Sequence, residues 1–144
     1  MQNTQAYQLT AYCGIYCGEC ECYKAKDNEK LFEYLVSRGV PKENLPCPGC
    51  REKEGNCPVI GETCETYACA ISHGVDFCYE CADFPCHRLN PAADRAEVLP
   101  HNLKLYCLCS IMNKGLEEFT KEYPIIKQKY YKGKMSVGKG PILD

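Results

Sequence analysis

The sequence contains no tryptophan and three histidines, and no stretch of it approaches the roughly 18 consecutive apolar residues of a membrane-spanning helix. Its formal net charge is -2 over 144 residues, so no excess of either sign predicts a nucleic-acid or membrane partner. The opening residues, MQNTQAYQLTAYCG, lack the basic start and apolar run of a secretory signal peptide. We therefore expect a cytoplasmic protein of one or two domains.

Cysteine is the residue that the chain has in excess. It occurs 14 times, and twelve of these cysteines lie between residues 13 and 86, among glycines and prolines. In a reducing cytosol, clustered thiols favour metal or redox chemistry over disulfides. Without the cysteines the apolar content is moderate, so we expect one modest core and a first two-thirds held by something other than packing.

Three pairs of cysteines are separated by two residues, a spacing at which a tight turn lets both thiolates face one point. The pairs are Cys17/Cys20, Cys47/Cys50 and Cys78/Cys81. Pro48 and Gly49 favour such a reversal in the second pair. A structural zinc ion takes four ligands in a tetrahedron, with sulfur at about 2.3 Å. The repeated spacing therefore predicts two or three thiolate zinc centres.

The expected ligands are distributed over the whole cysteine-rich stretch: Cys13, Cys17, Cys20, Cys47, Cys50, Cys57, Cys64, Cys69, Cys78, Cys81 and Cys86. Our interpretation groups Cys13, Cys17 and Cys20 in one centre, and Cys47 with Cys50 in a second. A third contains Cys78, Cys81 and Cys86, and the three remaining cysteines complete the sets. Spacing alone does not fix the grouping, because ligands of such centres often interleave.

The other cysteines and the histidines have weaker patterns. Cys107 and Cys109 lie two apart in a predicted helix, point to different faces and are expected in the core. Cys22 is compatible with a ligand or with a bystander. His87 is an alternative fourth ligand beside Cys86, whereas His73 is expected to interact with a helix C-terminus.

The pattern predicts an α-rich fold with irregular, metal-stapled loops and little strand. Helices are expected over 27–39, 64–74, 91–99 and 100–115, with a last helix from 116 that Pro124 interrupts or kinks. Residues 1–90 would form a cysteine-rich metal-binding domain, and residues 91–144 a helical extension packed on it.

Iron–sulfur chemistry is the main alternative. The spacing Cys13-x3-Cys17-x2-Cys20 also occurs in the cluster loop of radical S-adenosylmethionine enzymes, but those have a long β/α barrel that 144 residues with few strands cannot build. An electron-transfer or redox [4Fe–4S] protein remains open, since soft thiolates bind both metals. No motif assigns an enzymatic activity, a protein partner or an oligomeric state.

The C-terminal stretch offers a third reading. Six lysines and one acid lie between residues 121 and 139, with Tyr130 and Tyr131 adjacent. Basic residues interleaved with aromatics bind single-stranded nucleic acid. A solvated helix end followed by a packed tail explains the same composition, and we favour it over nucleic-acid binding.

Three motifs, YCGIYCGEC, CPGCR and CAISHGVDFCYECADFPCHRL, resemble the cysteine-rich prokaryotic family known as domain of unknown function 3795. The resemblance covers roughly residues 11 to 90. It matches nine of the expected ligands and leaves Cys22, Cys107 and Cys109 outside the pattern. It implies metal binding and carries no assigned activity.

Overall fold

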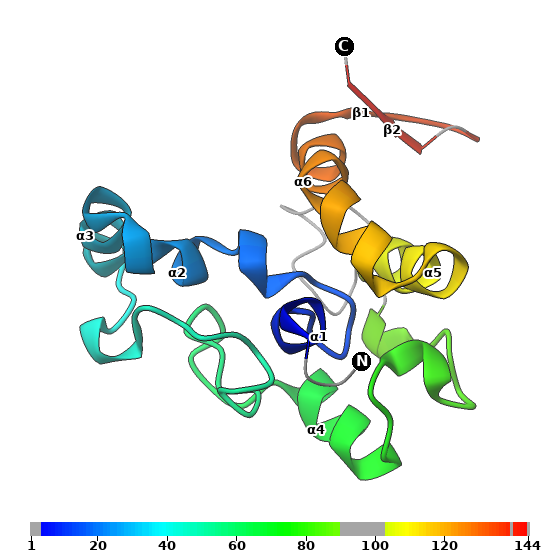
Figure 1. The fold of residues 1–144 in the computed structure, drawn as a ribbon, viewed down its shortest axis with the longest axis horizontal. Helices are drawn as coiled ribbons and strands as arrows, with labels where there is room; N and C mark the ends of the chain where they lie inside the picture. Colours follow the sequence, from blue (N-terminus) through cyan, green and yellow to red (C-terminus); the bar gives the residue numbers. More distant parts are fainter. Residues whose placement is uncertain (1–3, 90–102, 139, 144) are drawn as a thin grey trace.

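The computed structural model describes residues 4–89, 103–138 and 140–143. In Figure 1, α2 and α3 lie on one side of the molecule and α5 and α6 on the other, with α1 between them and α4 below. The described residues do not include the helix expected over 91–99, the start of the helix expected over 100–115, or the expected domain boundary after residue 90.

The first two-thirds of the chain consists of short helices and 3₁₀ turns (η) joined by loops. In chain order the elements are α1 (Gln5–Leu9), η1 (Cys17–Glu19), α2 (Glu21–Lys24), η2 (Ala25–Asp27), α3 (Glu29–Ser37), η3 (Lys42–Asn44), α4 (Glu65–His73), η4 (Cys78–Glu80) and η5 (His87–Leu89). The expected α-rich class with irregular loops is confirmed. The short helix α1 was not predicted; at its start the Thr4 side chain accepts a hydrogen bond from the backbone N–H of Tyr7.

Two expected helices form with the predicted caps. The Asn28 side chain accepts a hydrogen bond of 3.0 Å from the backbone N–H of Leu31 at the start of α3. Gly74 ends α4 in the left-handed conformation, at φ 65°. None of the residues of α3 is buried, so this helix contributes little to the core.

The C-terminal part contains two longer helices and a small hairpin. The helix α5 (Leu103–Lys114) ends before Gly115, as expected, and α6 (Leu116–Lys132) follows at once. Pro124 lies inside α6, which continues through it as one helix. The strands β1 (Lys134–Ser136) and β2 (Gly140–Ile142) pair antiparallel, with Met135 opposite Pro141. We did not expect this hairpin.

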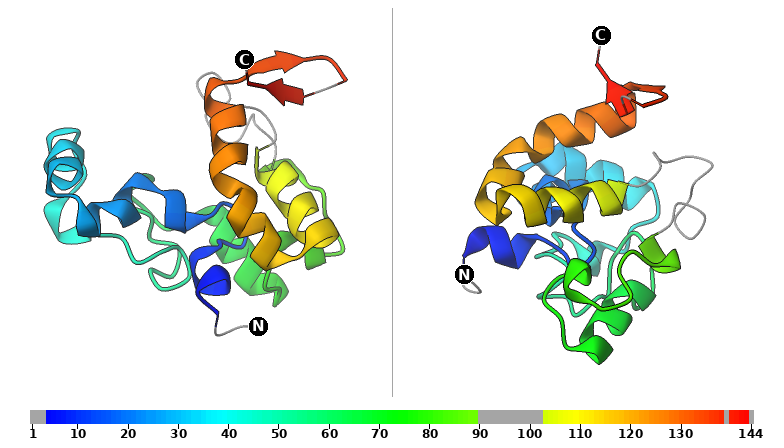
Figure 2. Two further views of the ribbon diagram at one scale, coloured as in Figure 1. Left: turned by 45° about the horizontal axis from the view of Figure 1, so that its top comes forward. Right: turned by 90° about the vertical axis from the view of Figure 1, so that its right-hand side faces the viewer.

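The hydrophobic core belongs mainly to α5 and α6, which pack against each other (Figure 2). Its buried residues are Ala6, Phe77, Leu89, Leu103, Cys107, Leu108, Ile111, Leu116, Phe119, Tyr123 and Ile126. Between residues 12 and 69, by contrast, the buried hydrophobic residues are Cys22, Ala25 and Leu45. Apolar packing therefore accounts for the C-terminal helices and leaves the cysteine-rich loops weakly supported.

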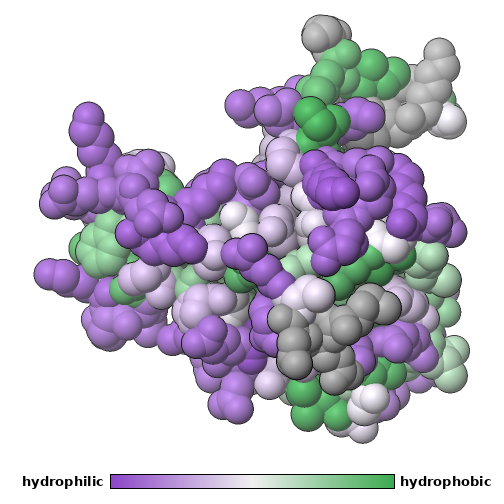
Figure 3. All heavy atoms as spheres, viewed as in Figure 1, coloured by the Kyte–Doolittle hydropathy of each residue, from purple (hydrophilic) through white to green (hydrophobic). Residues whose placement is uncertain are grey.

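The surface follows the same division. In Figure 3, hydrophilic residues cover much of the part that contains α2 and α3, while hydrophobic residues gather at the β1–β2 hairpin. Val137 and Ile142 of this hairpin are exposed. Among the described helices, none has the length and apolar character that a membrane crossing requires.

Candidate metal centres

The first group of thiols, here the Cys22 cluster, consists of Cys20, Cys22, Cys47 and Cys57. The Cys22 thiol donates a hydrogen bond to the sulfur of Cys20, and this bond lowers the pKa of Cys20. The backbone N–H groups of Cys22 and Tyr23 lower it further. The same hydrogen bond raises the pKa of Cys22, and burial and the charges of Cys20, Cys47 and Cys57 raise it further. A backbone hydrogen bond of 2.9 Å joins the Cys47 N–H to the carbonyl oxygen of Cys22. These thiols share one neighbourhood.

The second group, here the Cys50 cluster, consists of Cys13, Cys17, Cys50 and Cys64. The backbone N–H of Cys50 donates to the sulfur of Cys17 over 3.4 Å. Burial raises the pKa of Cys50, and the nearby thiolates of Cys13, Cys17 and Cys64 raise it further, ahead of that of Cys57. Burial likewise raises the pKa of Cys17 to about 12. The thiols of Cys13, Cys17 and Cys64 therefore lie near Cys50, and the first cluster adjoins this one through Cys20, Cys47 and Cys57.

The third group, here the Cys78 cluster, consists of Cys69, Cys78, Cys81 and Cys86. These four cysteines and His73 line one pocket of about 30 Å³ between α4, η4 and η5. Burial raises the pKa of Cys78 to about 12, followed by the charges of Cys13 and of the other three members. Cys13 therefore lies between the second and third clusters. The Cys78 N–H also donates to the carbonyl oxygen of Tyr12 over 2.8 Å.

This grouping differs from the one that spacing favoured. Cys20 is the N-cap residue of α2, and its thiol interacts most strongly with that of Cys22, although it also lies near Cys17. The pair Cys47/Cys50 is divided in the same way between the first two clusters. The interleaving that the sequence left open thus arises where the chain turns at the first two C-x2-C pairs.

The structure agrees in part with what was expected of the cysteines and the histidine outside the predicted ligand set. Cys107 is fully buried, and burial raises its pKa, with Cys13 as a second cause. Cys109 is half-buried and lies on another face of α5. His87 is exposed in η5 and does not line the pocket of the Cys78 cluster. Cys22 lies inside a cluster and is 2 % exposed, although neither spacing nor resemblance selected it.

Arg51, directly after the second C-x2-C pair, fixes this loop between the clusters. Its guanidinium lies over the rings of Tyr7, Tyr12 and Phe77, with 4.0, 4.1 and 4.9 Å to their centroids. It donates to the carbonyl oxygens of Tyr7, Thr10 and Asp76, at 3.0, 2.8 and 2.7 Å. One side chain therefore joins α1, the CPGCR loop and the segment before η4. Sequence reasoning missed this role, since it depends on aromatic residues distant along the chain.

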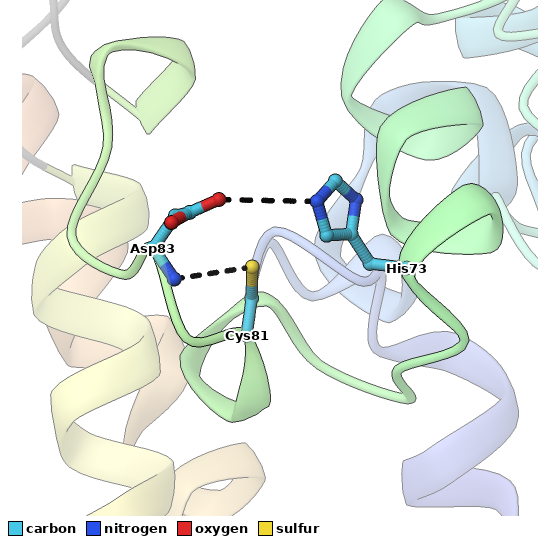
Figure 4. Close-up of side chains that lie close together, drawn as sticks. All are labelled: His73, Cys81 and Asp83. Atoms are coloured by element: carbon cyan, nitrogen blue, oxygen red, sulfur yellow. Dashed lines mark hydrogen bonds and ion pairs between the residues drawn. The ribbon is translucent and has the colours of Figure 1, made fainter.

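One smaller group of side chains has the shortest mutual distances. The potential ligand atoms of His73, Cys81 and Asp83 all lie within 4.8 Å of one another (Figure 4). In the part of the chain that the structure describes, no three sulfurs of a thiol cluster meet this limit. Closing a cluster around an ion therefore requires its thiols to turn inward.

The donor sets fit metal binding. Each cluster supplies four thiols, and backbone N–H groups already face the sulfurs of Cys17 and Cys81, at 3.4 Å in both cases. Such bonds stabilise a thiolate, which is the form that binds metal. The cysteines of the described residues form no disulfide.

The family described as "Protein of unknown function (DUF3795)" matches residues 9–91, more than half of the 144-residue chain. The chain belongs to this family, and the resemblance seen in its motifs is confirmed. No curated protein and no solved structure matches the chain. The cysteine content and the group of His73, Cys81 and Asp83 together indicate metal binding.

Proposed function

We propose that this protein binds three zinc ions, one in each thiol cluster, and that these ions hold the cysteine-rich region in shape as an interaction or sensor module. The observation that carries the proposal is the gathering of twelve cysteines in three adjoining groups of four. Cys20, Cys47 and Cys57 also lie near thiols of the second group, and Cys13 links the second group to the third. Four thiolates per ion is the ligand set of a closed structural zinc site. The two cysteines left over, Cys107 and Cys109, lie on α5.

The weak apolar packing of residues 12–69 supports a structural role for the ions. Thiolate zinc sites in small domains contribute roughly 10 kcal/mol or more of folding free energy. Of the three buried hydrophobic residues in this stretch, Leu45 is the one with a large aliphatic side chain, and its burial supplies about 1.5–3 kcal/mol, well below the contribution of one ion. The proposal therefore makes the metal, rather than the core, the main source of stability in this region.

The third cluster is the one whose four thiols line a single pocket. Four thiolates around one ion form a closed structural zinc site. Zinc at the Cys78 cluster requires only that the four surrounding thiols turn toward the centre of this pocket.

Iron–sulfur binding remains a second candidate for the other two clusters, and one observation favours it. Cys20 lies three residues after Cys17 yet belongs to the neighbouring cluster. In two-cluster ferredoxins, one cysteine of a closely spaced run likewise ligates the other cluster. In that case the protein would transfer electrons or support redox catalysis.

A nucleic-acid role for the C-terminal tail is less well supported. The Nζ of Lys127 donates to the carbonyl oxygen of Glu19 over 2.6 Å and lies 3.0 Å from the carboxylate of Glu21. This lysine therefore joins α6 to the cysteine-rich region instead of offering its charge to a phosphate.

We propose a reducing compartment, the cytoplasm, as the location in which the thiols stay available to metal.

The experiment that tests the proposal is elemental analysis of protein purified without oxygen, with its visible spectrum recorded beside it. We expect about three zinc ions per chain and no visible absorbance. Iron with matching sulfide and a broad band near ~400 nm would contradict zinc binding and support the iron–sulfur candidate. A strong chelator should abolish cooperative thermal unfolding, and an apo protein that melts like the loaded one would contradict a structural role.

A further inference from the structure

A mixed set of metal-binding side chains lies on the exposed side of the Cys78 cluster. His73 is the last residue of α4, Cys81 follows η4, and Asp83 lies two residues further on (Figure 4). The histidine and aspartate side chains are 43 % and 80 % exposed. Solvent, and an ion dissolved in it, can therefore reach this group without any movement of the chain.

The imidazole of His73 is held in the tautomer that binds metal through the outward nitrogen. Its Nδ1 lies 2.8 Å from the carbonyl oxygen of Cys69, which can only accept, so Nδ1 carries the proton. The Nε2 lone pair then faces Asp83. Histidine ligands of metals are commonly oriented in this way, with the second ring nitrogen donating to a backbone carbonyl.

The spacing of the donors suits an ion better than a direct contact. Nε2 of His73 and the nearer carboxylate oxygen of Asp83 are 3.9 Å apart, too far for a hydrogen bond. Two ligands at about 2.1 Å from a tetrahedral ion lie roughly 3.4 Å from each other, which a small side-chain rotation reaches. The sulfur of Cys81 already accepts the backbone N–H of Asp83 over 3.4 Å, as a thiolate ligand does.

We propose that His73, Cys81 and Asp83 form an exchangeable site for a borderline divalent cation such as Zn²⁺ or Co²⁺. One nitrogen, one sulfur and one oxygen give three protein ligands, and the fourth position is left to water. Cys81 is also a member of the Cys78 cluster, so its thiolate bridges the two ions when both are bound. Only this sharing rests on the proposed function; the three-ligand site does not.

Such a site differs from the three thiol clusters in its exchange behaviour. Its ligands are exposed and fewer, so its ion equilibrates with solvent, whereas a closed tetrathiolate releases its ion slowly. An ion bound here is one thiolate away from the Cys78 cluster. The site is thus placed to receive a metal ion before the other thiols of the Cys78 cluster do.

Cobalt titration into the zinc-loaded full-length protein tests the proposal. We expect one additional Co²⁺ per chain, with thiolate-to-cobalt absorbance, removed by a weak chelator that leaves the tightly bound zinc in place. His73→Gln and Asp83→Asn should each weaken this binding by at least about tenfold, with unchanged tight zinc content. His87→Gln is the matched control, since this exposed histidine lies outside the group, and it should bind cobalt as the wild type does.

The outcomes separate the two proposals. No cobalt beyond the zinc equivalents, or cobalt binding that survives the double variant His73→Gln/Asp83→Asn, would overturn the exchangeable site. Protein purified without tightly bound zinc would contradict the proposed function. If that protein still bound one Co²⁺ through His73 and Asp83, the three-ligand site would stand without the sharing of Cys81.

Discussion

The backbone N–H of Cys50 donates a hydrogen bond to the sulfur of Cys17 over 3.4 Å, although 33 positions separate the two residues. The bond connects the first two C-x2-C motifs through the backbone of Cys50 and the side chain of Cys17. It also offers the Cys17 sulfur a donor that stabilises the thiolate. A backbone contact that involves no metal therefore holds two members of the Cys50 cluster together.

Replacing Cys17 by serine should remove one metal ion per chain. The hydroxyl group is a poor zinc ligand at neutral pH, and three thiols hold the ion less well than four. We expect about one zinc equivalent fewer by elemental analysis and a lower thermal midpoint. Cys109→Ser is the matched control, because Cys109 belongs to no cluster, and it should keep the full metal content. Equal losses in both variants would contradict the cluster assignment.

Arg51→Lys should destabilise the protein by about 2–4 kcal/mol. A lysine keeps the positive charge but cannot donate to the three carbonyl oxygens in the same fixed geometry or place a planar cation over the rings of Tyr7 and Tyr12. Urea unfolding of the metal-loaded protein measures the change. The same substitution at the exposed Arg38 should have an effect within about 0.5 kcal/mol. If the two variants unfold alike, Arg51 does not fix the loop.

Tyr7 should make stability fall at high pH. Burial and the hydrogen bond to Asp76 raise the pKa of Tyr7 from 10.0 to about 12. Because the folded-state pKa is raised, the contribution of the protonated phenol is present below pH 10 and is lost between pH 10 and about 12. Unfolding experiments across this window should give a shallower decline for Tyr7→Phe than for the wild type.

The control for this pH effect is Tyr34→Phe, since Tyr34 is an exposed tyrosine of α3. It should leave the decline above pH 10 as steep as in the wild type. A Tyr7→Phe protein with the wild-type slope would show that the pKa of Tyr7 is not raised by folding.

Gly14→Ala should be more damaging than Gly61→Ala. Both glycines have a positive φ, 91° and 80°, so alanine is strained by about 1–2 kcal/mol at either position. A Cβ at Gly14 would also lie 3.0 Å from Cβ of Cys107 and 3.2 Å from the backbone nitrogen of Leu108, whereas nothing lies within 4 Å at Gly61. The overpacking should add about 1–3 kcal/mol at Gly14, measured by urea unfolding.

Local sequence signals predicted the helices well where a cap or terminator was present. Asn28 and Gly74 marked the ends of α3 and α4 because each acts through its own backbone or side chain. The continuity of α6 through Pro124 was not predictable in the same way. Packing of Phe119, Tyr123 and Ile126 in the core offsets the loss of one helical hydrogen bond.

The candidate sites were predictable in their chemistry and less so in their grouping. Repeated C-x2-C spacing was enough to expect thiol sites, but which sulfurs meet depends on contacts such as the one between Cys47 and Cys22. No local pattern distinguishes Asp83 from other exposed acids. Its place beside His73 arises only because η4 and the end of α4 come together in the fold.

The interleaving of the first two clusters has a consequence for biosynthesis. Their last members along the chain are Cys57 and Cys64, so neither set of four exists until nearly half of the protein has left the ribosome. The nascent chain therefore exposes four thiols before the cysteines that complete each set are translated, those of Cys13, Cys17, Cys20 and Cys22. During that interval the nascent chain depends on a reducing environment and on the absence of competing soft metals to reach its native arrangement.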